Sequence, residues 1–269
     1  MAVWSGPFCG AARTAAWGNE DNVTRKSDIN LHADMRLTYI YHSGFALETE
    51  RCVVIIDCWK DPSGAVAGLL EGSKPVYVLA SHFHEDHFNP AVLDWGRRRA
   101  GVTYVLSKDI MRRRRAPKDA ACWLVKGGRF ADGNVDVRAF GSTDSGISLL
   151  IGIDGRLVFH AGDLNNWQPA VPGGGGAGER AEAMYLGEIK DLLKVTAAVD
   201  VALFPVDARI GAGYLRGPSQ FAGRIRTSLF VPMHFTACGE ASAAAFAPVA
   251  QSLGCRFWLP AGAGSSISV

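Results

Sequence analysis

The chain has 269 residues, of which 48% are hydrophobic and 20% are charged, and its formal net charge is +2. A chain of this length can bury one large core or two modest ones. So small a net charge does not indicate nucleic acid or an anionic membrane as a partner. No apolar run approaches the ~20 residues that span a bilayer. Two arginine runs, 97–99 and 112–115, are interpreted as solvated helix faces.

The cysteines and the N-terminus favour a cytoplasmic location. Six scattered cysteines without a C-x-x-C pair are typical of reduced, mostly buried thiols, although a Cys52–Cys58 disulfide stays an alternative. The first residues lack the basic start and unbroken apolar stretch of a signal peptide. Residues 1–34 show no periodicity, so we expect a poorly structured extension there and a single catalytic domain over residues 35–269.

From Met35 onward the predicted elements alternate. Strands are expected within residues 36–58, 74–82, 102–107, 135–163, 199–207, 228–234 and, as the last, 255–260. Helices are expected within residues 89–100, 107–116, 179–194, 218–226 and 240–253, and a glycine-rich loop over 172–178. Asn89 can cap the first helix, with Pro90 at its first position. This order predicts a mixed α/β fold with helices covering sheets.

Two segments share one plan, which indicates an internal duplication. Residues 42–57 and 144–163 both run from a polar residue, Ser and Gly through an apolar strand, a turn with Arg and a second apolar strand to Asp. We therefore expect two similar half-units that pack sheet against sheet.

The segment "SHFHEDHFNP", residues 81–90, predicts a metal site. It follows the apolar run "VYVLA" directly, so its polar side chains lie at the carboxyl end of a strand, where ligands bind in open α/β sheets. His82 and His84 are two residues apart and point the same way on an extended backbone, while Asp86 and His87 follow at the turn. Imidazole and carboxylate groups suit Zn²⁺, Fe or Mn.

This segment resembles the H-x-H-x-D-H motif of the metallo-β-lactamase-fold hydrolases. Two more pieces match in order: Asp163 of "VFHAGD" takes the place of the family's metal-bridging Asp, and His234 of "FVPMH" that of its last His. The resemblance covers roughly residue 35 to the C-terminus. The pieces "HSGF" and "FHAGD" look most like the ascorbate-phosphate lactonase-like branch.

The resemblance implies a four-layered αββα sandwich of two half-units around two divalent metal ions, chiefly Zn²⁺. It assigns His82 and His84 to the first ion, Asp86, His87 and His234 to the second, and Asp163 to both.

One position departs from the family pattern. A third His for the first ion is expected before the Gly of the second half-unit, and alignment on Gly146 places Thr143 there. Thr143 and Asp144 would point to opposite faces of a strand. Asp144 is the nearest strong ligand, and a carboxylate in place of an imidazole shifts the preference toward Mn²⁺ or Fe²⁺. We therefore predict that Asp144 approaches the first ion.

Five further residues are candidates for supporting roles or substrate contacts. Asp57 ends a buried strand and is expected to orient a ligand histidine. His42 has two interpretations, a pocket-lining and a structural one, and His160 is expected beside the site or in the core. Asp207 and Arg209 either reach the substrate or form a surface ion pair.

The predicted function is hydrolysis of an ester, lactone or phosphodiester by a metal-bound hydroxide. Asp86 or Asp163 would transfer the proton afterwards. The expected partner is a small, anionic substrate, with neither nucleic acid nor membrane. Two alternatives stay open: a mononuclear-iron oxygenase acting on a thiol or persulfide, and a non-catalytic binding protein with the same fold.

Overall fold

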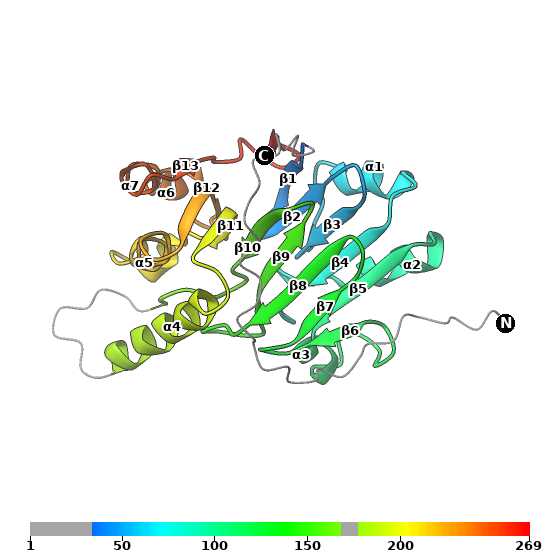
Figure 1. Cartoon of the computed structure of the whole chain (residues 1–269), viewed down its shortest axis with the longest axis horizontal. Coiled ribbons are helices and arrows are strands. Elements are labelled where there is room, and N and C mark those ends of the chain that lie inside the picture. The colour runs from blue at the N-terminus through cyan, green and yellow to red at the C-terminus, as the bar shows by residue number, and fades with distance from the viewer. Residues whose placement is uncertain (1–33, 168–176) are drawn as a thin grey trace, which may run out of the picture.

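Figure 1 shows the protein as a computed structural model, which describes residues 34–167 and 177–269. The expected extension, 1–34, lies outside the described residues except for Asp34. The expected glycine-rich loop also falls largely outside them. Among the described residues, none of the helices has the length and apolar character that a bilayer span requires.

The first sheet has seven strands in the order β14-β1-β2-β3-β4-β5-β6. Its members are β1 (Arg36–Tyr41), β2 (Gly44–Glu48), β3 (Val53–Ile56), β4 (Val76–Ala80), β5 (Val102–Ser107), β6 (Cys122–Leu124) and β14 (Ser266–Ser268). The pairs from β14 to β3 are antiparallel and those from β3 to β6 are parallel.

The second sheet repeats this plan in the order β13-β12-β11-β10-β9-β8-β7. Its members are β7 (Arg129–Ala131), β8 (Val135–Phe140), β9 (Ser148–Ile153), β10 (Arg156–His160), β11 (Ala198–Pro205), β12 (Arg226–Met233) and β13 (Arg256–Phe257). Antiparallel pairing runs from β7 to β10 and parallel pairing from β10 to β13. The segments 42–57 and 144–163 therefore supply matching antiparallel hairpins, β2–β3 and β9–β10.

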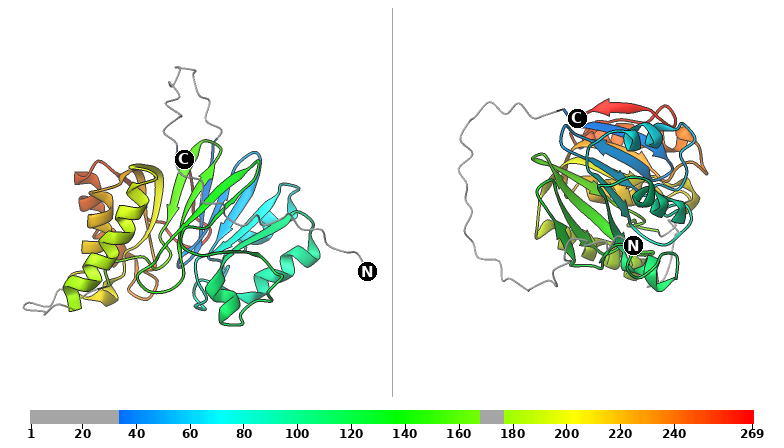
Figure 2. Two further views of the ribbon diagram at one scale, coloured as in Figure 1. Left: turned by 60° about the horizontal axis from the view of Figure 1, so that its bottom comes forward. Right: turned by 90° about the vertical axis from the view of Figure 1, so that its right-hand side faces the viewer.

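Helices cover the outer face of each sheet, so the molecule has four layers (Figure 2, left). The helices α1 (Ala65–Glu71), α2 (Trp95–Arg98) and α3 (Lys108–Arg112) belong to the first half, with the 3-10 turn η1 (Pro90–Asp94). The second half holds α4 (Ala177–Leu193), η2 (Ala208–Ile210), α5 (Arg216–Ala222), α6 (Glu240–Ala244) and α7 (Ala247–Ser252). One large cluster of buried side chains joins the two sheets, and a smaller one lies under α1–α3. The predicted αββα fold class is confirmed.

Several short elements differ from the sequence prediction. The helix α1 and the strands β6, β7 and β14 were not expected, and the last strand is β14 rather than residues 255–260, of which only β13 is a strand. Strands of two or three residues are too short to show hydrophobic periodicity, so they form only because they pair with a neighbouring strand of the sheet. The helix expected over 240–253 is divided into α6 and α7, and Pro248 occupies the first turn of α7, where its missing N–H costs nothing. Cys52 and Cys58 are free, so the alternative of a disulfide between them is wrong.

Candidate metal centre

The strand ends of both sheets bring the predicted residues together. Residues 81–87 follow β4, Asp163 follows β10, Asp207 follows β11 and His234 follows β12. Because parallel strands end at a common edge, these segments meet there. Of the seven histidines, His32 lies outside the described residues, and the other six all lie in or beside this site.

The motif loop alternates between inward and outward side chains. His82 and His87 are fully buried, and Nε2 of His82 lies 2.9 Å from Nδ1 of His84. The intervening Phe83 and Glu85 face away: the Arg113 guanidinium lies 4.8 Å from the Phe83 ring centre, and Glu85, whose side chain is 82% exposed, pairs with Arg115 at 3.5 Å. The second arginine run therefore contacts the outward side of the motif.

Two groups of four side chains have the composition of metal sites. Within each group, one potential ligand atom per residue lies within 4.8 Å of the others. The first group consists of His82, His84, Asp144 and Asp163. The second group consists of His42, Asp86, His87 and His234.

The carboxylate of Asp163 lies between the two groups. Its Oδ2 is 3.2 Å from Nε2 of His82, and its Oδ1 is 3.1 Å from Nε2 of His87 and 3.5 Å from Nε2 of His234. One carboxylate thus faces ligand atoms of both groups with different oxygens, which is the arrangement that the family's bridging Asp implies.

Buried atoms without hydrogen bonds show that these residues fit metal ions. Nε2 of His42, Nε2 of His87 and Oδ1 of Asp163 are buried and have no aligned hydrogen-bond partner. Leaving buried polar atoms unpaired costs about 1–3 kcal/mol each. A divalent cation would satisfy all three, because neutral imidazole nitrogens and carboxylate oxygens are its preferred ligands.

Two buried carboxylates hold the second group's histidines from behind. Asp57 Oδ2 lies 2.7 Å from Nδ1 of His87, and Asp207 Oδ2 lies 2.8 Å from Nδ1 of His234. Ser81 donates to Asp57 from its amide at 2.7 Å and from its hydroxyl at 2.6 Å. With Nδ1–H donated to a carboxylate, each ring presents its Nε2 lone pair to the site.

Charge is concentrated around His87. Burial alone would lower the pKa of His87, but Asp163 and Asp57 raise it to about 10. Burial likewise opposes ionisation of Asp163, yet His87 and His82 hold the pKa of Asp163 well below its usual value. Without a metal, a proton on His87 therefore takes the place of positive charge between the two carboxylates.

Asp144 reaches the first group and Thr143 does not. Asp144 Oδ2 lies 3.7 Å from Nδ1 of His84, whereas the Thr143 hydroxyl donates to the backbone oxygen of Asn165 at 2.5 Å. The predicted alternation of Thr143 and Asp144 along a strand is wrong, because residues 141–147 form a loop between β8 and β9.

Gly146 allows this loop to approach the motif. Its φ is +70°, and a Cβ there would lie 2.1 Å from the backbone oxygen of Ser81 and 2.4 Å from Cβ of His82. Only glycine fits such an approach without displacing backbone. The amide of Ile147 then donates to the Ser81 oxygen at 3.0 Å, which holds the loop and its Asp144 against the motif.

The two remaining histidines differ in their surroundings. His160 is fully buried, and its ring nitrogens lie near the Ser43 oxygen at 2.9 Å and the Gly162 amide at 3.1 Å. Its Nε2 is also 3.9 Å from Asp57. His42 is a member of the second group itself.

Asp207 and Arg209 form the ion pair that one of the two interpretations expects, but the Asp207 carboxylate lies beneath the surface. Asp207 is buried and accepts hydrogen bonds from the Arg209 guanidinium at 2.9 and 2.5 Å. The side chain of Arg209 is 53% exposed and covers the outer side of that carboxylate. Two supporting residues were not predicted from the sequence: Ser81, which adjoins the motif, and Thr236, whose hydroxyl lies 2.6 Å from Nδ1 of His42.

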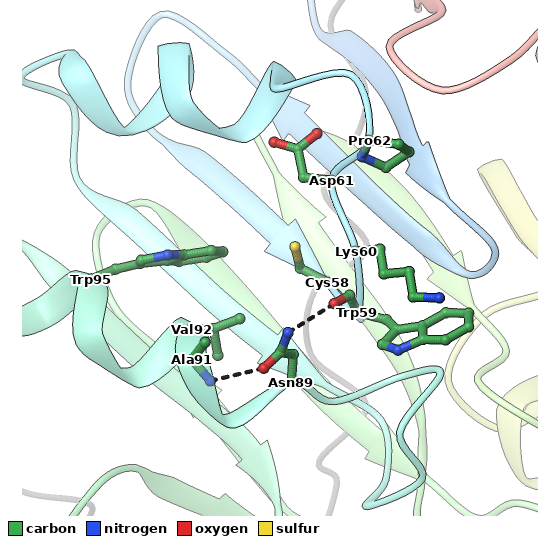
Figure 3. Close-up of a pocket in the computed structure, with 9 residues that line it drawn as sticks. All are labelled: Cys58, Trp59, Lys60, Asp61, Pro62, Asn89, Ala91, Val92 and Trp95. Carbon is green, nitrogen blue, oxygen red and sulfur yellow. Dashed lines mark hydrogen bonds between the residues drawn. The ribbon is translucent and has the colours of Figure 1, made fainter.

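An open cavity of about 410 Å³ lies on the His42 side of the centre, although none of the eight candidate ligands lines it (Figure 3). Trp59 and Trp95 lie on opposite sides of it, with Cys58 and Val92 between them. The Trp59 ring is 5.9 Å from the His42 ring, so one side chain separates the cavity from the second group. The Lys60 ammonium lies 3.9 Å from the Trp59 ring centre. The cavity therefore offers an aromatic wall and a cation near the candidate ligands.

Comparisons with known proteins agree with this arrangement. No family model matches the chain. A curated relative, a UPF0173 metal-dependent hydrolase of Symbiobacterium thermophilum, is 26% identical over 211 residues, which cover 75% of this chain and 84% of the relative.

Solved structures share the fold at low identity. Igni18, a metallo hydrolase of the archaeon Ignicoccus hospitalis, superposes with a TM-score of 0.63 at 19% identity, covering 88% of this chain and 98% of that one. The metallo-β-lactamase-fold protein YhfI of Bacillus subtilis gives 0.57 at 14% identity, covering 88% and 100%. These similarities confirm the resemblance to metal-dependent hydrolases with the metallo-β-lactamase fold.

Proposed function

We propose that this chain, which has the metallo-β-lactamase fold and is related to a metal-dependent hydrolase, cleaves an ester, lactone or phosphodiester with water activated by two divalent ions. The observation that carries the proposal is the pair of four-residue groups joined by Asp163, with ligand-type atoms left unpaired in the buried space between them. Buried polar groups are normally hydrogen-bonded, so three unpaired ligand-type atoms within one site indicate a missing partner there.

The candidate ligands and the nearby carboxylates would have different roles in this reaction. The first group would hold one ion, and the second group the other, with Asp163 facing both. Divalent ions in such a site lower the pKa of bound water toward 7 and polarise a carbonyl or phosphoryl oxygen. Asp86, whose side chain is partly exposed, and Asp163 are the carboxylates placed to accept the proton that water releases.

The ligand types indicate which ions each group prefers. The second group offers three imidazoles and one carboxylate, which suits Zn²⁺. The first group offers two imidazoles and two carboxylates, which shifts its preference toward harder ions such as Mn²⁺ or Fe²⁺.

The substrate class follows from the sequence resemblance and the adjoining cavity. Lactones are included because "HSGF" and "FHAGD" look like the ascorbate-phosphate lactonase-like branch. An organic group of the substrate would lie against Trp59, and Lys60 would pair with an anionic one.

The test measures metal content and hydrolysis together. Protein purified without added metal is analysed for bound ions, and the reconstituted protein is assayed on chromogenic esters, lactones and phosphodiesters. We expect hydrolysis that chelation abolishes and metal restores. Glu85→Gln is the matched control, because Glu85 lies within the motif but faces solvent, and it should keep full activity.

A measurement of oxygen uptake distinguishes the proposed hydrolase from the main alternative, an iron-dependent oxygenase. An iron-dependent oxygenase would consume O₂ with a thiol or persulfide and hydrolyse none of the panel. Such a result, or two bound ions with neither reaction, would contradict the proposed hydrolase.

A further inference from the structure

The backbone at His42 is held in an unusual conformation. Its φ is 57°, in the left-handed region that only a few per cent of non-glycine residues adopt, with Asn, Asp and His the most frequent among them. The amide of His42 donates to the Tyr39 hydroxyl at 2.8 Å, and its carbonyl accepts from the amide of His234 at 3.2 Å. The β1–β2 turn of the first half is thereby attached to the end of β12, next to a predicted ligand. Strain of this kind concentrates at functional sites.

The ring of His42 is placed like that of a ligand. Nδ1 lies 2.6 Å from the Thr236 hydroxyl, so a proton on Nδ1 leaves the Nε2 lone pair free. Nε2 is buried without a hydrogen-bond partner and lies 3.3 Å from Oδ2 of Asp86. The side chain is only 4% exposed, so bulk water has little access to this nitrogen.

His160 shows what a structural histidine looks like in the same region. It is equally buried, but both of its nitrogens have backbone partners, the Ser43 oxygen and the Gly162 amide. Neither ring nitrogen of His160 is therefore available to coordinate an ion. His42 differs in the one respect that matters for coordination, since its Nε2 faces the other members of the second group and has no aligned donor or acceptor.

We propose that Nε2 of His42 is a ligand of the ion held by Asp86, His87 and His234. This inference rests on the proposed metal centre but not on the reaction that the centre catalyses. With His42, four residues of the second group would face its ion in addition to the shared Asp163, whereas the first group has only three residues of its own. Fewer positions for water and substrate would therefore stay open at the second ion than at the first. The structure agrees, because the first group is the more exposed one: the side chains of His84 and Asp144 are 38% and 48% exposed, whereas in the second group only Asp86, at 35%, reaches solvent to a similar extent.

The competing role for His42 is to position Asp86 by a hydrogen bond. Loss of such a supporting contact lowers metal affinity by about 10–100-fold, whereas loss of a ligand should lower it further. His42→Asn suits the experiment because Asn tolerates the left-handed backbone. Thr236→Val is the matched variant, since it removes only the contact behind the ring.

The decisive measurement is whether His42 is bonded to the ion. In protein with ¹⁵N-labelled histidine and saturating ¹¹³Cd²⁺, a ring nitrogen bonded to cadmium is split by its nuclear spin and a nearby nitrogen is not. We expect five split rings in the wild type, three from the second group and two from the first. His42→Asn should lose one of them and bind Cd²⁺ more than about 100-fold more weakly, while Thr236→Val keeps all five.

Four split rings in the wild type would overturn the proposal and make His42 a positioning residue. Because this count needs no variant, a His42→Asn protein that fails to fold does not remove the test. No activity enters the measurement, so a wrong reaction class would leave the count of five unchanged, whereas a protein that binds no cadmium would refute the metal centre itself.

Discussion

The two groups of the metal centre have the same kinds of ligand but different surroundings. The three histidines of the second group are buried, and the carboxylates of Asp57 and Asp207 fix two of them. The first group shares Asp163 but opens to solvent at His84 and Asp144. A rigid, buried site loses less entropy on binding an ion and excludes competing water, so the second group should bind more tightly and exchange more slowly. The comparison indicates that burial and the hydrogen bonds behind the ligands, and not ligand type alone, make the metal affinities of the two groups differ.

The most severe test removes the residue common to both groups. Asp163→Asn should lower the affinity of both sites and reduce hydrolysis by more than the ~10–100-fold expected for a supporting residue, because its two oxygens face ligand atoms of both groups. Isothermal titration with Zn²⁺ and the assay panel check this. Loss of a single ion only would mean that Asp163 belongs to one group.

A carboxylate behind the second group should matter less. Asp207→Asn should weaken the tighter site about 10–100-fold, because Nδ1 of His234 loses its charged acceptor. The weaker site should be unchanged, which two-site titration can resolve. Arg209→Ala is the comparison: its half-exposed guanidinium pairs with Asp207 and lies 3.1 Å from Nδ1 of His234, but the charged acceptor of that ring stays in place, so a smaller effect is expected. An equal loss at both sites would remove the distinction between the groups.

The pH dependence of metal uptake should follow His87. The folded chain raises the pKa of His87 to about 10 from a usual 6.5. The protonated ring therefore stabilises the metal-free fold fully below pH 6.5, and this contribution is lost as the pH rises through about 10. A cation must displace that proton, so affinity at the second group should rise with pH across this window, by up to about tenfold per unit. Titrations at three pH values check this, and a flat profile would contradict it.

The smallest effect is expected at the exposed ligand. Asp144→Asn should weaken only the first group, by about tenfold, because water can replace a half-exposed carboxylate. Metal stoichiometry measured at limiting Zn²⁺ should fall toward one ion. Thr143→Ala should leave the stoichiometry unchanged but cost about 1 kcal/mol of stability, since its hydroxyl bonds the backbone of Asn165. Unchanged stoichiometry in Asp144→Asn would exclude Asp144 from the site.

Much of the site could be predicted because its chemistry is local. The spacing of His82, His84, Asp86 and His87 is set by a few successive dihedral angles after one strand, so it is visible in the sequence. Asp163 and His234 were found through the order of their motifs. The long strands and the repeated hairpins were equally readable, because burial against a sheet imposes apolar runs.

What the sequence could not determine depends on contacts between distant segments. The motifs in the sequence led us to expect an αββα fold and histidine and carboxylate ligands for metal ions. Only the tertiary structure decided that a loop, bent at Gly146, carries Asp144 to His84, and that the turn at His42 meets the end of β12. It also decided that Asp207 lies buried behind His234 and that β14 completes the first sheet. In each case the partner lies far away in the chain, so no local pattern of side chains records the contact.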